Sequence, residues 1–423
     1  MKWLWWQIGL VGLMLGMMAC GSAEEPTPLP EAAATEEAVV TTAVSSAGTP
    51  LSPTSTALPA TDTPPAASDD FVPTDTPTTA DIKIAATSVT GIDSGIIAFT
   101  SINEGADLYA LVPGQVPVRM TYAQGLSFGA VWSPSGQRIA YFFLDGVTRS
   151  TDIWYFDISE GPDPVAVTND NEANNIKRLT WSADSEFLAY DAPQADGEES
   201  DIYRVAVVSG EIINLTEDAS TWDASPAWSP DGERIAFVSD RADEGKASDN
   251  IWLMDSEGGQ LQQLTNSDAT FQDDIEPSWS PDGSQIAFLR HSLLGDSPDP
   301  TSPSGLWLVD VATGEEQSLV HITGFLVGVQ PPVWSLDGRW LAYNAPGLAD
   351  TDIWVVPVAG GEPINVGNLP GADATISWAP DSQQLIFTNS EGGTMSQFIV
   401  NVDGSALRLL VEGGENGLGN WSP

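Results

Sequence analysis

Cysteine, histidine and basic residues are all scarce in this sequence of 423 residues. It contains one Cys, two His, and 14 Lys and Arg against 59 Asp and Glu, which gives a formal net charge of −45. A strongly anionic surface repels phosphates, so nucleic-acid binding is excluded. Because Cys20 is the only cysteine, the chain cannot form an internal disulfide.

The sequence also lacks a hydrophobic run of membrane-spanning length. The run Trp3–Ala19 follows Lys2 and is too short for a comfortable span, but it suits an export signal. The segment Met17-Met18-Ala19-Cys20 resembles the bacterial lipoprotein box, which implies cleavage after residue 19 and lipidation of Cys20. We therefore expect an exported protein, periplasmic or on the cell surface, whose only membrane contact is this lipid anchor. The alternative is a plain secretory signal or membrane anchor with a chance Cys.

Residues 20–91 are dominated by Thr, Pro, Ala and Ser, as in PTSTALPATDTPPAASDD. Such a segment has too little apolar surface to offset the entropy lost on ordering, and its prolines favour extended conformations. The composition predicts a disordered stalk between the anchor and a folded domain.

From residue 92 to residue 423 the chain repeats a short pattern every 43 to 55 residues. A Trp starts each repeat and is followed by a turn such as SPDG, an apolar run such as RIAFVSD, a strand such as NIWLMD, and a segment such as QLQQLT. Four strands in a repeat of this length are typical of a propeller blade. The anchors are Trp132, Trp181, Trp228, Trp279, Trp334, Trp378 and Trp421.

The residue types explain the pattern. Pro, Asp and Gly form the turn, and the Trp before it can fill the space between adjacent blades. The chain enters at GIIAFTS (95–101), a second strand, and ends at GLGNWSP (417–423), a first strand. The sequence thus predicts an all-β fold, a seven-bladed β-propeller of four-stranded blades, in which the chain termini share one blade and close the ring.

The WSPDG…IAF…DIW…LT pattern resembles the TolB-type propeller repeats, distant relatives of the WD repeats. TolB itself is similar to a six-bladed ring preceded by a small α/β domain, unlike the seven anchors and the stalk found here. Related propellers occur in prolyl oligopeptidases, where a separate α/β-hydrolase domain carries the catalytic Ser. The G-x-S-x-G match in this chain, GLSFG (125–129), falls inside the propeller repeats just before the anchor Trp132, and the chain ends at its seventh anchor. We therefore expect no hydrolase domain and no enzyme activity.

Metal chemistry has few candidate ligands. Oligogalacturonate lyases, seven-bladed relatives, use a metal with several His ligands, whereas this chain has only His291 and His321. The two fall on one predicted blade and could bind a metal together with Asp296 or Asp299, although two strands separate them. Asp and Asn clusters could hold Ca²⁺ but follow no EF-hand order, so we expect no cofactor.

Acidic residues gather in the loops that share one face of the predicted ring. The interpretation is an electronegative binding face for a protein or basic peptide, and the alternative is a surface that serves only solubility. A monomer that acts as a non-catalytic binding module is the expected function. The rival is a carbohydrate- or cell-wall-active enzyme with a carboxylate pair in the channel. The predicted face contains Asp223, Asp273, Asp274, Glu276, Asp373 and Glu415.

Overall fold

The computed structural model describes residues 95–422 outside a set of short segments. These segments are 102–105, 113–116, 123–124, 159–162, 169–175, 177, 195–198, 218–220, 242–247, 267–271, 293–303, 323–329, 347–350 and 412–415. The expected signal and stalk, Cys20 included, lie outside the described residues. Within the described part, no helix is long and apolar enough to cross a membrane.

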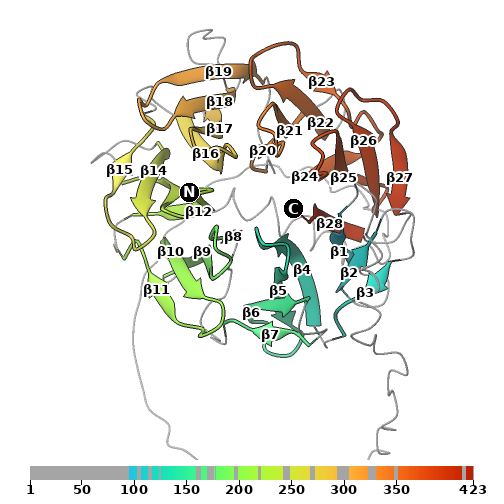
Figure 1. Ribbon diagram of the computed structural model, residues 1–423, viewed down its shortest axis with the longest axis horizontal. Helices are drawn as coiled ribbons and strands as arrows, with labels where there is room; N and C mark the ends of the chain where they lie inside the picture. Colours follow the sequence, from blue (N-terminus) through green and yellow to red (C-terminus); the bar gives the residue numbers. More distant parts are fainter. Residues whose placement is uncertain are drawn as a thin grey trace, which may run out of the picture. The chain divides into compact units, whose positions relative to one another are not determined.

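The described residues form seven antiparallel sheets of four strands arranged in a ring (Figure 1). The all-β, seven-bladed fold expected from the sequence is confirmed. The first blade contains β4 (Gly125–Trp132), β5 (Arg138–Asp145), β6 (Thr151–Asp157) and β7 (Val165–Ala166). The second contains β8 (Leu179–Trp181), β9 (Phe187–Pro193), β10 (Ser200–Ala206) and β11 (Ile212–Asn214). The third contains β12 (Asp223–Trp228), β13 (Arg234–Ser239), β14 (Asn250–Asp255) and β15 (Gln262–Gln263).

The remaining blades follow in chain order. The fourth contains β16 (Gln272–Trp279), β17 (Gln285–Ser292), β18 (Gly305–Asp310) and β19 (Glu316–His321). The fifth contains β20 (Val333–Trp334), β21 (Trp340–Pro346), β22 (Thr351–Pro357) and β23 (Ile364–Asn365). The sixth contains β24 (Ala372–Trp378), β25 (Gln384–Glu391), β26 (Thr394–Asn401) and β27 (Arg408–Val411). The seventh contains β28 (Asn416–Trp421), β1 (Ile97–Ser101), β2 (Asp107–Leu111) and β3 (Val118–Arg119).

The turn after each Trp is held by its own side chains, as the third blade illustrates. Ser229 Oγ donates to Asp231 at 2.5 Å and accepts the Arg234 N–H at 2.9 Å. Asp231 in turn accepts the Glu233 N–H, and Gly232 adopts a φ of 75°. Because a positive φ is easy only for Gly, the Ser-Pro-Asp-Gly sequence specifies this turn.

Each Trp that starts a repeat is buried against the preceding blade. In five of the seven repeats among the described residues, its indole N–H also donates to the carbonyl of the residue just before the preceding blade's Trp. These bonds, 2.9–3.1 Å long, run from Trp132 to Asn420, from Trp181 to Val131, from Trp279 to Ala227, from Trp334 to Ser278, and from Trp378 to Val333. The Trp therefore fixes the innermost strands of adjacent blades to each other as well as filling the space between them.

The two ends of the propeller meet in the seventh blade. β28 pairs with β1 in an antiparallel register that places Trp421 opposite Ile97. Ser422 extends the contact, since its N–H donates to Ile96 O at 2.7 Å and its Oγ accepts the Ile96 N–H at 2.9 Å. The ring is thus closed by hydrogen bonds between chain ends, as the sequence predicted.

Candidate functional site

The innermost strands carry an unusual backbone feature at the same position in several blades. Three residues before the Trp, the chain forms a β-bulge and takes a left-handed conformation, with φ of 66° at Gly129, 53° at Ser225, 57° at Glu276 and 50° at Thr375. Gly adopts this conformation freely, whereas other residues incur strain. Strained polar residues that recur around the centre of a ring mark a candidate site.

An ion pair links the residues at this position in the second and fourth blades, which are not neighbours in the ring. Arg178, which precedes β8 in the second blade, donates to Glu276 Oε1 of β16 in the fourth. Figure 1 shows β8, β12 and β16 as consecutive inner strands around the centre of the ring. Ser225 holds the same position on the intervening strand β12. We call Arg178, Asp223, Ser225 and Glu276 the axial site.

Acceptor atoms in the axial site are left without partners. Glu276 is 1% exposed and Asp223 is fully buried, yet Glu276 Oε2, Asp223 Oδ1 and Ser225 Oγ have no hydrogen-bond partner among the described residues. Buried polar atoms of this kind are uncommon and call for an explanation. The three atoms lie on the inner strands of the adjacent third and fourth blades.

Burial also changes the acidity of the two carboxyl groups. It raises the pKa of Glu276, and the nearby Arg178 offsets only part of that effect while Asp191 adds to it. Burial likewise raises the pKa of Asp223 against the opposing charge of Arg241, which donates to Asp223 Oδ2 at 2.5 Å. Carboxyl groups with raised pKa values and unpaired oxygens are typical of functional sites.

Three residues of the predicted electronegative face have arginine partners. Asp223, Asp274 and Glu276 are buried, and each pairs with an arginine. The Arg290 guanidinium binds Asp274 through two bonds of 2.6 and 2.8 Å and also reaches Glu316 at 2.8 Å. These arginines therefore neutralise part of the negative charge of the predicted acidic face.

The other predicted acids are dispersed. Asp373 is buried and accepts a hydrogen bond from the Asn389 amide at 2.7 Å. Asp273 is half-buried and accepts the Asp249 N–H at 3.0 Å. Glu415 lies outside the described residues. The structure thus brings Asp223 and Glu276 to adjacent inner strands and leaves Asp373 in the sixth blade.

The predicted histidine pair does share one blade. His291 lies in β17 and His321 ends β19, with β18 between them, and burial lowers the pKa of His291. Asp296 and Asp299 lie outside the described residues. Among the residues that the structure describes, no three His, Cys, Asp or Glu side chains gather as a metal site would require.

Sequence reasoning missed the arginines that complete these pairs. Arg178, Arg241 and Arg290 belong to a chain with only 14 basic residues. Arg290 in β17 lies opposite Asp274 in β16, whereas Arg241 comes two residues after Ser239, the residue opposite Asp223. The antiparallel register was therefore the available signal, because it brings opposite and diagonal side chains of neighbouring strands together.

Comparisons with known proteins agree with the repeats. The model of the TolB beta propeller domain family matches residues 108–292. The uncharacterized peptidase YuxL of Bacillus subtilis is 30% identical over 206 residues, 41% of this chain and 29% of the relative. Dipeptidyl-peptidase 5 of Porphyromonas gingivalis is 28% identical over 157 residues, 35% of this chain and 21% of the relative. The chain spans less than a third of the length of these two relatives.

Among solved structures, oligogalacturonate lyase from Vibrio parahaemolyticus superposes with a TM-score of 0.58 at 14% identity, covering 73% of this chain and 86% of the lyase. At that identity the likeness concerns the fold alone. The expectation of a non-catalytic binding module is overturned, since the relatives that the sequence matches include two peptidases. The chain is a seven-bladed β-propeller built from TolB-type repeats.

Proposed function

We propose that this propeller is the substrate-handling part of a peptide-hydrolysing system. Its similarity to two peptidases supports a role in hydrolysis, although the chain matches only a part of each relative. In this proposal the ring binds a peptide and presents it to a catalytic domain or subunit.

The observation that carries the proposal is the set of unpartnered acceptors in the axial site. Glu276 Oε2, Asp223 Oδ1 and Ser225 Oγ can all accept hydrogen bonds, and the two carboxylates add negative charge. A positively charged, donor-rich part of a peptide complements such a site, because it would satisfy buried acceptors that the free protein leaves unsatisfied. The net charge of −45 would also attract a basic peptide over long range.

Peptide binding tests the proposal directly. We expect a labelled peptide with one lysine to bind more tightly than its norleucine analogue, with fluorescence anisotropy as the measurement. Glu276→Gln removes the buried charge at constant size and should weaken binding by about tenfold or more, as for other buried charged contacts. Glu362→Gln, at an exposed position, is the matched control and should bind like the wild type.

Hydrolysis is measured in parallel with the same peptides. Adding the chain to an envelope extract from a strain that lacks it should increase peptide cleavage, followed by mass spectrometry, and the Glu276→Gln chain should increase it less. The proposal would be wrong if wild type and Glu276→Gln bound the lysine peptide equally and neither changed the rate of cleavage.

We place this activity at the cell envelope. The segment ending in Met18-Ala19-Cys20 supports this proposal, because it resembles a lipoprotein signal with a cysteine for lipidation. Two acyl signals are needed for a stable anchor, and a lipoprotein cysteine supplies them at one residue. Cys20→Ser should therefore move the protein from the membrane fraction to the soluble fraction; an unchanged distribution would contradict the anchor.

A further inference from the structure

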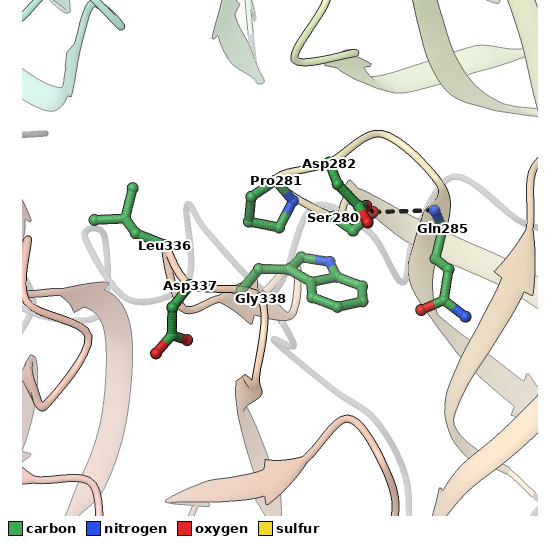
Figure 2. Close-up of a pocket in the computed structure, with 8 residues that line it drawn as sticks. Ser280, Pro281, Asp282, Gln285, Leu336, Asp337 and Gly338 are labelled. Atoms are coloured by element: carbon green, nitrogen blue, oxygen red, sulfur yellow. Dashed lines mark hydrogen bonds between the residues drawn. The ribbon is translucent and has the colours of Figure 1, made fainter.

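A cavity of about 330 Å³ opens between the fourth and fifth blades, at the opposite end of the inner strands from the axial site. Figure 2 shows Ser280, Pro281 and Asp282 on one side of it and Leu336 and Asp337 on the other. These are the turns that follow Trp279 and Trp334. Leu336 is 49% exposed, so the cavity has an apolar edge open to solvent.

We call the space between the post-Trp turns of two adjacent blades a junction. At three other junctions of the ring, an arginine occupies this space. Between the first and second blades, Arg138 donates to Ser185 O at 2.8 Å. Between the second and third, Arg204 donates to Ser256 O at 2.7 Å and lies 4.7 Å from the Phe187 ring centre, and the remaining cavity is about 150 Å³. The repeat thus provides an internal arginine for this junction in successive blades.

The third junction shows how the arginine is held. Between the third and fourth blades, the Arg234 guanidinium lies 5.1 Å from the centre of the Trp279 ring. The hydrogen bond from Ser229 is the largest cause of the lowered pKa of Asp231, and the positive charge of Arg234 lowers it further. An aromatic face and an ionised Asp therefore form the arginine site, a combination that favours guanidinium through cation–π and charge interactions.

The junction between the fourth and fifth blades keeps this site but lacks the arginine. Trp334 corresponds to Trp279, and its indole N–H donates to Ser278 O at 3.0 Å, which fixes the ring. Asp282 corresponds to Asp231, and hydrogen bonds from Ser280 and Ser284 lower its pKa. Gln285 replaces the arginine found at the position of Arg138 and Arg234.

The third strand does not supply a cation at this junction either. Arg204 faces Ala189 in the second blade, and the equivalent pairing in the fourth blade joins Leu308 to Ala287. Asp337 on the far side of the cavity already pairs with Arg339 at 2.5 Å. Asp282, which lines the cavity together with Trp334, is therefore the carboxylate that can pair with a bound cation.

We propose that this cavity binds the guanidinium of an arginine side chain presented by a partner protein. The site reproduces the environment that Arg234 has one junction earlier, and no residue that lines the cavity is an arginine. Pro281 and Leu336 would cover the aliphatic part of the incoming side chain, as apolar surface does for arginine at interfaces. The acidity of the chain favours a basic partner. This inference is independent of the axial site.

A pair of reciprocal substitutions tests the proposal on the full chain. The probe is the capped dipeptide Ac-Ala-Arg-NH₂, with the lysine and citrulline analogues for comparison, and calorimetry gives affinity and stoichiometry. We expect one site at this cavity that prefers arginine to lysine and citrulline and that is still present in Glu276→Gln, where the axial site is weakened. Gln285→Arg supplies the arginine that the first and third blades have at this position and should reduce probe affinity at least tenfold. Arg234→Gln empties the neighbouring junction and should raise the stoichiometry by one.

Controls separate this site from stability effects and from the proposed peptide site. Gln285 is a half-buried residue at a turn, so Gln285→Arg should keep the wild-type melting temperature, and its result stands even if Arg234→Gln does not fold. Glu276→Gln should bind the arginine probe at this cavity like the wild type, whatever the outcome at the axial site. Equal affinity in wild type and Gln285→Arg, or equal affinity for arginine and citrulline, would overturn the proposal.

Discussion

Arginine is the residue that organises charge in this acidic protein. Arg241 and Arg290 each bind a buried carboxylate near the start of an inner strand, and Arg178 binds the buried Glu276 within one. Arg138, Arg204 and Arg234 instead fill junctions at the end of the inner strands. Guanidinium suits both roles because it binds carboxylates with fixed geometry and stacks on aromatic rings. The two sites proposed above lie at the two ends of this scheme, one among the paired carboxylates and one at a junction without an arginine.

The buried acid of the axial site should leave a signature in the pH dependence of stability. Burial raises the pKa of Glu276 above its ordinary 4.5, so the contribution of this group to stability is complete below 4.5 and is lost as pH rises through its native pKa. Glu276→Gln cannot ionise. Its melting temperature relative to wild type should therefore increase as pH rises above 4.5, measured by thermal unfolding between pH 4 and 8.

Asp145 provides a control of opposite sign. Hydrogen bonds from the backbone of Thr148 and then Val147 lower its pKa below 3.8, so its contribution is present above 3.8 and is lost as pH falls. The difference in melting temperature between Asp145→Asn and wild type should therefore stay constant between pH 5 and 8. A Glu276→Gln difference that is equally flat over this range would show that Glu276 ionises without cost in the folded protein.

At the scale of strands, nearly all of the fold could be predicted from the repeat, because the residues of the repeat form the hydrogen bonds that define each blade. The Thr of the LT segment, for example, accepts the backbone N–H of the Ile in the DIW segment, as Thr265 does for Ile251 at 3.0 Å. The site was less predictable. Asp223 and Glu276 were identified from the sequence, but their burial and pairing depend on Arg241 and Arg178, and Arg178 reaches Glu276 across an intervening blade. No local pattern encodes such a contact.

The Trp-to-carbonyl bonds between inner strands should have a measurable effect. Trp181 is 6% exposed and its Nε1 donates to Val131 O, whereas Trp228 is 8% exposed and its Nε1 has no partner among the described residues. Substituting either by Phe removes a similar volume. Trp181→Phe should therefore lower the free energy of unfolding by about 0.5–1.5 kcal/mol more than Trp228→Phe, measured by denaturant titration. Equal losses would mean that the bond contributes nothing beyond packing.

At the scale of the whole ring, stability and function depend on one closure. The inner strands hold the axial site at their start and the arginine junctions at their end, so both sites need the blades to keep their spacing. Six blades are continuous in sequence, and only the seventh combines strands from the two ends of the described chain, β28 and β1. An opened ring would expose the edge of β1 and the apolar faces of two blades, which favours aggregation.

Removing residues 416–423 should therefore open the ring. The deletion removes β28, including Trp421, which is 4% exposed. The backbone N–H of Trp421 donates to Ser377 Oγ of the sixth blade at 2.8 Å. Losing this Trp alone should cost about 3–5 kcal/mol. We expect a large drop in melting temperature, and a synthetic peptide of residues 416–423 should restore it in proportion to its concentration, since it binds only the folded ring. The same peptide with Trp421→Ala should fail to restore it. An unchanged melting temperature after the deletion, or equal rescue by both peptides, would contradict closure by β28.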